Sequence, residues 1–250
     1  MDIRLYPHGE VAEWLAFPRL FEATELALVS AALKAGMKVV DAGANIGLYS
    51  ILAAKLVGPT GTVWSFEPAP ETFARLERNL SLNECDRVQS FRLALSDVPD
   101  ILLPLRSDRG FGDAYRYLAH DSAAPNPDDP GAALVSVTTL DQWATRSGAH
   151  DVDFLKIDVE GGEYRLLLGA REFLKSNPRV TVLFECEADW CDRSGCRQED
   201  AMDLLESLGF GLFAWETRSG KWVSDRPSLL SAGMLWACRD PRKLPARPNL

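Results

Sequence analysis

The chain has 250 residues, of which 46% are hydrophobic and 25% are charged, and its formal net charge is −9. This length and composition are typical of a globular protein, and one domain with insertions is the expected organisation. The acidic balance argues against the basic surface that proteins use to track DNA or RNA, and it is compatible with a small-molecule or cationic ligand.

Two further observations concern location and redox state. No apolar run approaches the ~20 residues of a membrane-spanning helix, and residues 1–6 lack the basic-then-apolar pattern of a secretory signal. The five cysteines include no CxxC pair, and the three histidines show no zinc-type spacing to them. We therefore expect a cytoplasmic protein with reduced thiols and without a membrane partner.

The first half of the chain alternates between strands and helices. After a mixed stretch over residues 1–21, helical spacing of apolar residues predicts a helix up to Gly36. The later patterns predict strands at 38–42, 62–67 and 88–95, with helices at 47–56 and 70–82 between them. The order β-α-β-α-β implies parallel strands joined by right-handed crossovers.

The middle of the chain breaks this alternation. Short strands are expected at 101–105 and 135–140, on either side of a polar loop over 107–133 that is rich in Asp, Gly and Pro. A loop of this length inside a compact domain is typical of a functional lid. Residues 108–117, which mix aromatic and cationic side chains, are a candidate for closing over an acceptor, with a solvated surface loop as the alternative.

Regular alternation then returns. The predicted elements are strands at 154–159, 180–186, 210–215 and 233–238 and helices at 141–146, 163–174 and 197–208. The expected fold is α/β, a doubly wound and mostly parallel seven-stranded sheet with helices on both faces and an antiparallel pair at its carboxy-terminal edge. The expected organisation is an extension at 1–21, one domain at 22–240 with an insertion at 97–150, and a tail at 241–250.

The strand that ends at Asp41 runs into a glycine turn, Gly43-Ala44-Asn45-Ile46-Gly47, that opens a helix. Glu67 stands at the end of the next apolar run, where a carboxylate can bind the two hydroxyls of an adenosine ribose. The sequence therefore predicts a cofactor that contains adenosine.

Asn45 and Asp41 bear on which cofactor that is. A dinucleotide site usually reads G-x-G-x-x-G, and Asn45 takes the place of the second glycine, where its side chain would crowd a pyrophosphate. Asp41 adds negative charge, which suits the ammonium and sulfonium groups of S-adenosylmethionine better than phosphates. We expect S-adenosylmethionine, and an NAD-dependent oxidoreductase on a similar fold is the alternative.

Four motifs of the chain resemble those of FkbM-type methyltransferases, and the similarity covers roughly residues 20–240. They are Asp41–Gly47, Phe66-Glu67-Pro68, Thr139-Leu140-Asp141 and the block Phe154-Leu155-Lys156-Ile157-Asp158-Val159-Glu160-Gly161. The resemblance implies a Rossmann-like class I S-adenosylmethionine-dependent methyltransferase that O-methylates a natural-product or sugar hydroxyl.

The resemblance also implies roles for particular residues. Asp41, Gly43 and Asn45 would line the methionine end of the cofactor and Glu67 would hold its ribose. Gly47 and Pro68, from the same two motifs, complete these two parts of the predicted cofactor site. Ser96 or Asp97, after the third predicted strand, would contact the adenine amino group.

Two carboxylates are candidates for the chemistry. In a doubly wound sheet the ligand crevice lies at the carboxyl ends of the strands where their order reverses, which places Asp158 beside Gly43 and the methyl donor. Glu185 ends the neighbouring strand. Asp158 would take the proton of an acceptor hydroxyl or contact the cofactor; alternatively, Asp158 and Glu185 would hold Mg²⁺ that acidifies that hydroxyl. Glu160 and Glu163 are expected to stabilise a helix amino terminus instead.

The predicted function is S-adenosylmethionine-dependent O-methylation of a small hydroxylated metabolite, without a nucleic-acid partner. A non-catalytic S-adenosylmethionine-binding module is a second alternative beside the oxidoreductase. The sequence leaves the oligomeric state open, a homodimer included.

Overall fold

The computed structural model describes residues 2–4, 23–107, 116–120 and 133–246. Most of the predicted amino-terminal extension and of the candidate acceptor loop at 108–117 therefore lie outside the described residues. None of the helices in the described ranges is both long and apolar enough to cross a bilayer.

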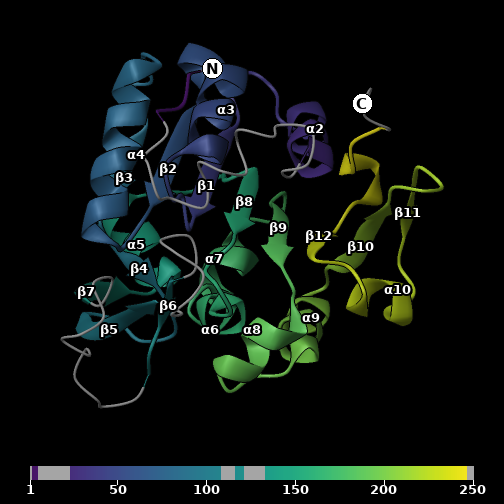
Figure 1. The fold of residues 1–250 in the computed structure, drawn as a ribbon. Helices are drawn as coiled ribbons and strands as arrows, with labels where there is room; N and C mark the ends of the chain where they lie inside the picture. The colour runs from purple at the N-terminus through teal and green to yellow at the C-terminus, as the bar shows by residue number, and fades with distance from the viewer. Residues whose placement is uncertain (1, 5–22, 108–115, 121–132, 247–250) are drawn as a thin grey trace.

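The described residues form a main sheet of eight strands, in the order β11-β10-β12-β9-β8-β1-β2-β3 (Figure 1). Strands β3, β2, β1, β8 and β9 are parallel, and β12, β10 and β11 pair antiparallel. The bounds are β1 Lys38–Ala42, β2 Thr62–Phe66, β3 Gln89–Phe91, β8 Phe154–Ile157, β9 Thr181–Glu185, β10 Gly211–Glu216, β11 Lys221–Val223 and β12 Met234–Cys238.

The predicted sheet is correct in type but not in strand number. The expected antiparallel pair exists as β10 and β12, yet β12 lies inside the sheet, between β9 and β10, and the short strand β11 forms the edge. Strand β11 has three residues, and its alternation is too short to be recognised in the sequence.

A second sheet combines β4, which precedes the predicted insertion, with three strands of the insertion, in the order β4-β7-β5-β6. Its strands are β4 Ala94–Leu95, β5 Ile101–Ser107, β6 Arg116–Leu118 and β7 Ala133–Thr138. The single strand predicted at 88–95 is thus two strands, because Ala94 and Leu95 leave the main sheet and pair with Val137 and Thr138. Figure 1 shows this sheet at the lower left, next to β3 at the edge of the main sheet.

Helices cover both faces of the main sheet, as expected (Figure 1). Their bounds are α2 Ala23–Ala32, α3 Leu48–Val57, α4 Pro70–Leu82, α5 Leu140–Ser147, α6 Glu163–Leu168, α7 Arg171–Ser176, α8 Ala188–Arg193, α9 Gln198–Ser207 and α10 Arg226–Leu230, with short 3₁₀ turns at Gly58–Thr60 and Pro241–Lys243. The predicted helix at 163–174 is two helices, since the chain breaks at Gly169 and Ala170.

Alternate residues of the buried strands supply the two cores. Val39, Val63 and Phe154 pack with α2 and α3, whereas Val40 and Leu155 face the core that includes α5, α6, α7 and α9. Side chains of neighbouring strand residues point to opposite faces, so each strand contributes to both cores. The polar residues that follow these strands are left at the carboxyl edge of the sheet.

Candidate active site

The turn after β1 is held against β2 by backbone hydrogen bonds. The N–H groups of Gly43 and Ala44 both donate to the carbonyl oxygen of Phe66, at 3.0 and 2.9 Å. Gly43 has φ of 78°, and a Cβ placed there would lie 1.7 Å from the carbonyl oxygen of Asp158. Only glycine fits a position with both constraints, and the turn therefore lies directly on the residue that follows β8.

Two of the other four residues of the predicted turn also have positive φ. Asn45 has φ of 47° and Gly47 has φ of 97°. A Cβ at Gly47 would lie 2.7 Å from Leu76 Cδ1, so this glycine lets α4 pack against the start of α3. The predicted glycine turn is thus confirmed as the link between β1 and α3.

Asp41 lies beneath this turn rather than on an open surface. Its side chain is 1% exposed, and Ser50 Oγ donates to Oδ2 at 2.6 Å. Burial raises the pKa of Asp41, and the nearby Lys156 and the Ser50 hydrogen bond act in the opposite direction. Placed in this way, the Asp41 carboxylate supports the turn from inside.

Lys156 is the cation that joins the β1 and β8 ends. Its Nζ lies 3.6 Å from Asp41 Oδ1 and 3.0 Å from Asp158 Oδ2, and it donates to the Gly43 carbonyl oxygen at 3.1 Å. It also sits over the ring of Tyr49, 4.8 Å from the centroid. The alternation of Lys156 with Asp158 along the strand suggests from the sequence that Lys156 pairs with Asp158 or Glu185, and the structure shows the pair with Asp158.

Glu67 follows β2 and is bound on both oxygens. Asn45 N–H donates to Oε2 at 3.0 Å and Ala69 N–H donates to Oε1 at 2.9 Å. Burial raises the pKa of Glu67 to about 7, although these two hydrogen bonds lower it. The carboxylate is therefore fixed next to the turn, with Pro68 half-buried beside it.

Asp158 stands at the carboxyl end of β8, and its side chain is 25% exposed. Its N–H donates to the Ala42 carbonyl oxygen at 3.0 Å, so the ends of β1 and β8 are in register. The predicted proximity of Asp158 and Gly43 is confirmed by this bond and by the backbone contact at Gly43.

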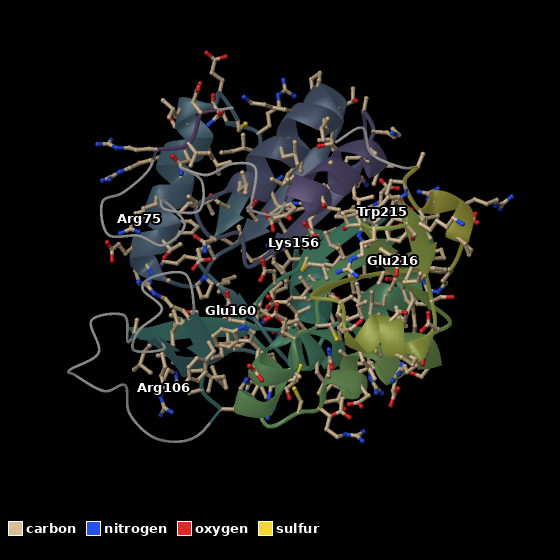
Figure 2. All side chains as sticks on the ribbon, turned by 45° about the vertical axis from the view of Figure 1, so that its right-hand side comes forward. Arg75, Arg106, Lys156, Glu160, Trp215 and Glu216 are labelled. Carbon is tan, nitrogen blue, oxygen red and sulfur yellow. The ribbon has the colours of Figure 1, made fainter. Side chains whose placement is uncertain are left out.

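Three further carboxylates surround Asp158. Glu163 accepts hydrogen bonds from Val159 N–H at 2.9 Å and Gly161 N–H at 3.3 Å, as expected for the first turn of α6. Glu160 has φ of 55°, and its shielded Oε2 has no hydrogen-bond partner among the described residues; the same holds for Glu185 Oε2. Figure 2 shows Lys156 and Glu160 toward the middle of the molecule, in contrast to Arg75 and Arg106 at its periphery.

These carboxylates raise one another's pKa. Burial, together with the charges of Asp158 and Glu163, raises the pKa of Glu160 to about 10 and that of Glu185 well above its ordinary value. Glu160 therefore holds a proton at neutral pH. The helix-stabilising role expected for Glu160 is not seen, because Glu160 precedes α6 and Glu163 makes the terminal hydrogen bonds.

Ser96 and Asp97 lie near each other and α6, at the junction of the two sheets. Ser96 is 1% exposed, and its Oγ lies 3.1 Å from Asp97 Oδ1 and 3.3 Å from His120 Nε2. Arg165 Nη1 donates to Asp97 Oδ2 at 3.0 Å. Sequence reasoning missed His120 and Arg165, since neither belongs to a recognisable motif.

None of the five cysteines forms a disulfide within the residues that the structure describes. Across the residues that the structure describes, no group of three or more His, Cys, Asp or Glu side chains is arranged to hold a metal ion.

Comparison with known proteins identifies the family. Residues 41–212 match the Methyltransferase FkbM domain. The chain belongs to the FkbM methyltransferase family. It is 31% identical to the 31-O-demethyl-FK506 methyltransferase FkbM of Streptomyces tacrolimicus over 203 residues, covering 73% of this chain and 75% of the relative. It is 29% identical to the methyltransferase sdnD of Sordaria araneosa over 218 residues, covering 78% and 80%.

The solved structure of an O-methyltransferase from Bacillus cereus in complex with SAH is similar in fold. The TM-score is 0.51 at 13% identity, over 91% of this chain and 88% of that chain. This FkbM-family chain thus has the class I methyltransferase fold, and it is an S-adenosylmethionine-dependent methyltransferase.

The residues of this FkbM-family chain fit that cofactor. Glu67 is a carboxylate fixed by two backbone hydrogen bonds next to the turn, and the turn itself lies directly on the Asp158 backbone because Gly43 has no side chain. The turn contains Asn45 where a dinucleotide site has glycine, which agrees with a cofactor that lacks a pyrophosphate.

Proposed function

We propose that this chain transfers the methyl group of S-adenosylmethionine to a hydroxyl oxygen of a small natural-product or sugar-containing acceptor, with Asp158 as the general base. The observation that carries this proposal is the position of Asp158. Its backbone lies against the Gly43 turn, and its side chain is partly exposed and held through Oδ2 by Lys156.

The name of a relative supports oxygen as the acceptor atom. The Streptomyces tacrolimicus protein is a 31-O-demethyl-FK506 methyltransferase, a name that refers to an oxygen atom of FK506. The net charge of −9 gives no sign of a nucleic-acid substrate.

In the cofactor half of the site, we propose that Glu67 binds the ribose hydroxyls and that Ser96 and Asp97 bind the adenine edge. Asp41, Asn45 and Gly47 shape the turn at the methionine end, and Pro68 borders the ribose. S-adenosylmethionine supplies an electrophilic methyl group on a sulfonium. The protein's contribution is then alignment, because in-line displacement depends on how closely the acceptor oxygen approaches that methyl.

An alcohol is a poor nucleophile at neutral pH, and removal of its proton by a placed carboxylate accelerates transfer by ~10²–10⁴-fold. Lys156 engages Asp158 Oδ2 at 3.0 Å, which leaves Oδ1 as the atom that accepts the proton. We prefer Asp158 to Glu185 for this step, because burial and the charge of Asp158 raise the pKa of Glu185 and its Oε2 is shielded. We assign to Glu185 the role of a neighbour that forms a hydrogen bond with the acceptor.

The test compares Asp158→Asn with the wild type. Methyl transfer from radiolabelled S-adenosylmethionine is measured over a panel of free sugars, glycosides and hydroxylated macrolides, and calorimetry measures the affinity for S-adenosylhomocysteine. We expect kcat to fall by ~10²–10⁴-fold while this affinity changes less than about threefold. Glu187→Gln, at an exposed position near the site, is the control and retains the wild-type rate.

Three outcomes would contradict parts of the proposal. An equal loss of affinity and kcat in Asp158→Asn would make Asp158 a cofactor ligand. Intact S-adenosylhomocysteine binding by the wild type, without transfer to any acceptor of the panel, would favour the non-catalytic module. Loss of turnover on EDTA treatment, restored by Mg²⁺, would replace direct base catalysis with the metal mechanism.

A further inference from the structure

The carboxyl end of α8 brings two cysteines together. Helix α8 ends at Arg193, and Gly195 has φ of 71°, the left-handed conformation that commonly follows a helix. The N–H group of Cys196 then donates to the carbonyl oxygen of Cys191 at 3.1 Å. This helix end is a Schellman motif, in which the side chains at these two positions frequently contact each other. We call Cys191 and Cys196 the thiol pair.

The two thiols of the pair are in contact. Cys196 Sγ donates to the Cys191 carbonyl oxygen at 3.4 Å. A hydrogen bond between the two thiols, together with burial, raises the pKa of Cys191. A disulfide needs Cα atoms about 4.4–6.8 Å apart, a spacing that the backbone hydrogen bond between the two residues maintains. The thiol pair can therefore close into a disulfide without unwinding of the helix end.

The members of the thiol pair differ in their access to solvent. Cys191 is 5% exposed, whereas Cys196 is half-buried. An oxidant therefore reaches the Cys196 sulfur first, and the Cys191 thiol lies beside it. Redox-responsive sites often have an accessible cysteine next to a second cysteine that resolves its oxidised form. The geometry assigns the first role to Cys196 and the second to Cys191.

The thiol pair lies against the turn that follows Asp158. A Cβ placed on Gly161 would lie 2.4 Å from the carbonyl oxygen of Trp190 and 2.8 Å from Ser194 Oγ. Cys196 Sγ lies 4.0 Å from the carbonyl oxygen of Gly161. The end of α8 and the Gly161 turn are therefore packed without space between them, and such packing transmits a displacement from one to the other.

We propose that Cys191 and Cys196 form a reversible disulfide on reaction with hydrogen peroxide, and that this disulfide slows methyl transfer. A disulfide holds its sulfurs at about 2.05 Å, closer than two thiols in a hydrogen bond, so the helix end tightens and displaces the Gly161 turn. The disulfide itself is independent of the proposed function. Its effect on the rate rests on that function, because the displaced turn follows Asp158.

The reaction consumes one hydrogen peroxide and releases two waters. The Cys196 sulfur attacks a peroxide oxygen, the O–O bond breaks, and the products are the sulfenic acid of Cys196 and water. The Cys191 sulfur then attacks the sulfenic sulfur, so that the S–S bond forms, the S–O bond breaks and the second water leaves. The two thiols lose two electrons, which reduce the peroxide. Thiol–disulfide exchange with an external dithiol reverses the reaction.

The position of Arg193 permits a direct test of the disulfide. Trypsin cuts after Arg193, so Cys191 falls in peptide 180–193 and Cys196 in peptide 194–197. The folded protein is treated with hydrogen peroxide, the remaining thiols are alkylated under denaturing conditions, and the digest is analysed by mass spectrometry. We expect the two peptides to be linked after peroxide treatment and separate after reduction with dithiothreitol.

Two matched variants identify the cysteines of the link. Cys186 also lies in peptide 180–193 and within electrostatic range of Cys191. Cys186→Ser can keep the bond that Cys186 Sγ donates to the Gln198 carbonyl oxygen, and this variant should retain the link. Cys196→Ser can keep the bond to the Cys191 carbonyl oxygen, and it should abolish the link. Thermal unfolding verifies that both variants are folded.

The rate of methyl transfer measures the effect on the site. With an acceptor from the panel described above, we expect oxidation to lower the rate by about tenfold, since a displacement of ~1 Å in an active site can cost ~10²-fold. Dithiothreitol should restore the rate. Cys196→Ser should have the rate of the reduced wild type and no response to peroxide.

Three results would overturn the proposal. Peptides that stay separate after peroxide treatment exclude the disulfide, and a link that is lost in Cys186→Ser assigns it to Cys186. An unchanged rate in the fully linked protein, or an equal loss of rate in Cys196→Ser, excludes control of methyl transfer by the thiol pair. Slower transfer by the linked protein together with a normal rate of Asp158→Asn would support the disulfide and remove Asp158 as the base.

Discussion

The two halves of the carboxyl edge differ in how their carboxylates are satisfied. On the β1–β2 side, both oxygens of Glu67 accept backbone hydrogen bonds, and Asp41 Oδ2 accepts one from Ser50. Asp41 Oδ1 has no hydrogen bond within the described ranges, but the Lys156 ammonium lies 3.6 Å from it. On the β8–β9 side, Glu160 and Glu185 each keep a shielded oxygen without a hydrogen-bond partner in the described ranges. Unsatisfied buried groups cost free energy and mark places where a ligand completes the structure.

This difference suggests that the two halves of the carboxyl edge have different roles in ligand binding. The β1–β2 side, which we propose as the cofactor half, has its Glu67 carboxylate fixed by hydrogen bonds within the chain, and such preorganisation lowers the ordering cost of ligand binding. The half next to Asp158 has hydrogen-bonding capacity that the chain itself does not use. The following four variants test this contrast, from the largest expected effect to the smallest.

Lys156→Met removes the cation that the two halves share. Because Asp41 is buried and Asp158 partly so, we expect a loss of about 3–5 kcal/mol in the free energy of unfolding at pH 7, measured by urea denaturation. The loss should shrink in acid, where a protonated Asp41 no longer requires a counter-charge.

Lys175→Met is the control for that variant, since Lys175 and Glu172 form a surface ion pair with both side chains exposed. Such pairs contribute about 0.2–1 kcal/mol. An equal loss of unfolding free energy in the two variants would mean that the ion pairs of Lys156 stabilise the fold no more than an exposed ion pair does.

Gly43→Ala tests the contact between the halves. The added Cβ meets the Asp158 carbonyl oxygen, and φ of 78° is unfavourable for alanine. We expect a loss of about 2–4 kcal/mol in stability and no measurable S-adenosylhomocysteine binding by calorimetry.

Gly148→Ala separates these two causes. Gly148 has φ of 68° at the end of α5, but a Cβ there has nothing within 4 Å. This control should lose only about 1–2 kcal/mol, from the backbone conformation. If Gly43→Ala loses no more stability than Gly148→Ala and binds S-adenosylhomocysteine normally, the contact of Gly43 with the Asp158 carbonyl contributes neither to stability nor to binding.

Glu67→Gln tests the fixed cofactor half alone. We expect S-adenosylhomocysteine to bind about ten- to a hundredfold more weakly, since charged hydrogen bonds contribute about 1.5–3 kcal/mol. With the pKa of Glu67 raised to about 7, wild-type affinity should fall as the pH drops from 8 to 6, because protonation weakens the acceptor. Calorimetry at three pH values checks both effects.

Glu71→Gln, at an exposed position of α4, serves as the control for Glu67→Gln and keeps the wild-type affinity. A pH dependence that persists unchanged in Glu67→Gln would assign the titration to another group.

Glu160→Gln tests the unsatisfied half, and here we expect a gain. The pKa of Glu160 is raised from 4.5 to about 10 by burial and by Asp158 and Glu163. Because the pKa of Glu160 is higher in the folded than in the unfolded state, its contribution to the free energy of unfolding is complete below pH 4.5. This contribution is lost as the pH rises toward 10. Thermal unfolding at pH 9 should therefore show Glu160→Gln to be about 1–2 kcal/mol more stable than the wild type.

The control at Glu187 clarifies this last effect. Glu187 is exposed, and Glu187→Gln should change stability at pH 9 by less than about 0.5 kcal/mol. A Glu160→Gln gain that is the same at pH 4 and pH 9 would contradict ionisation as its cause.

The sequence was sufficient for the elements with strong periodicity. The predicted ranges for β1 and α4 agree with the structure, because each combines a clear apolar pattern with a glycine or proline boundary. The juxtaposition of Asp158 and Gly43 also followed, since parallel topology alone brings the ends of neighbouring strands together.

Features set by distant contacts could not be predicted. The break between α6 and α7 falls at Gly169, where a Cβ would lie 2.0 Å from the Ser96 carbonyl oxygen. The turn to β4 depends on pairing with β7, and His120 reaches Ser96 only through the second sheet. None of these contacts leaves a local pattern in the sequence, which explains why short elements such as β6 and α8 were missed.

The contact of Gly43 with the Asp158 carbonyl has a consequence for how this enzyme can change. The turn that shapes the cofactor site and the residue proposed to take the acceptor proton touch through backbone atoms, without an intervening side chain. Movement of one therefore displaces the other. Under the proposed roles of these residues, a substitution at this contact would change both the affinity for the methyl donor and the placement of the base.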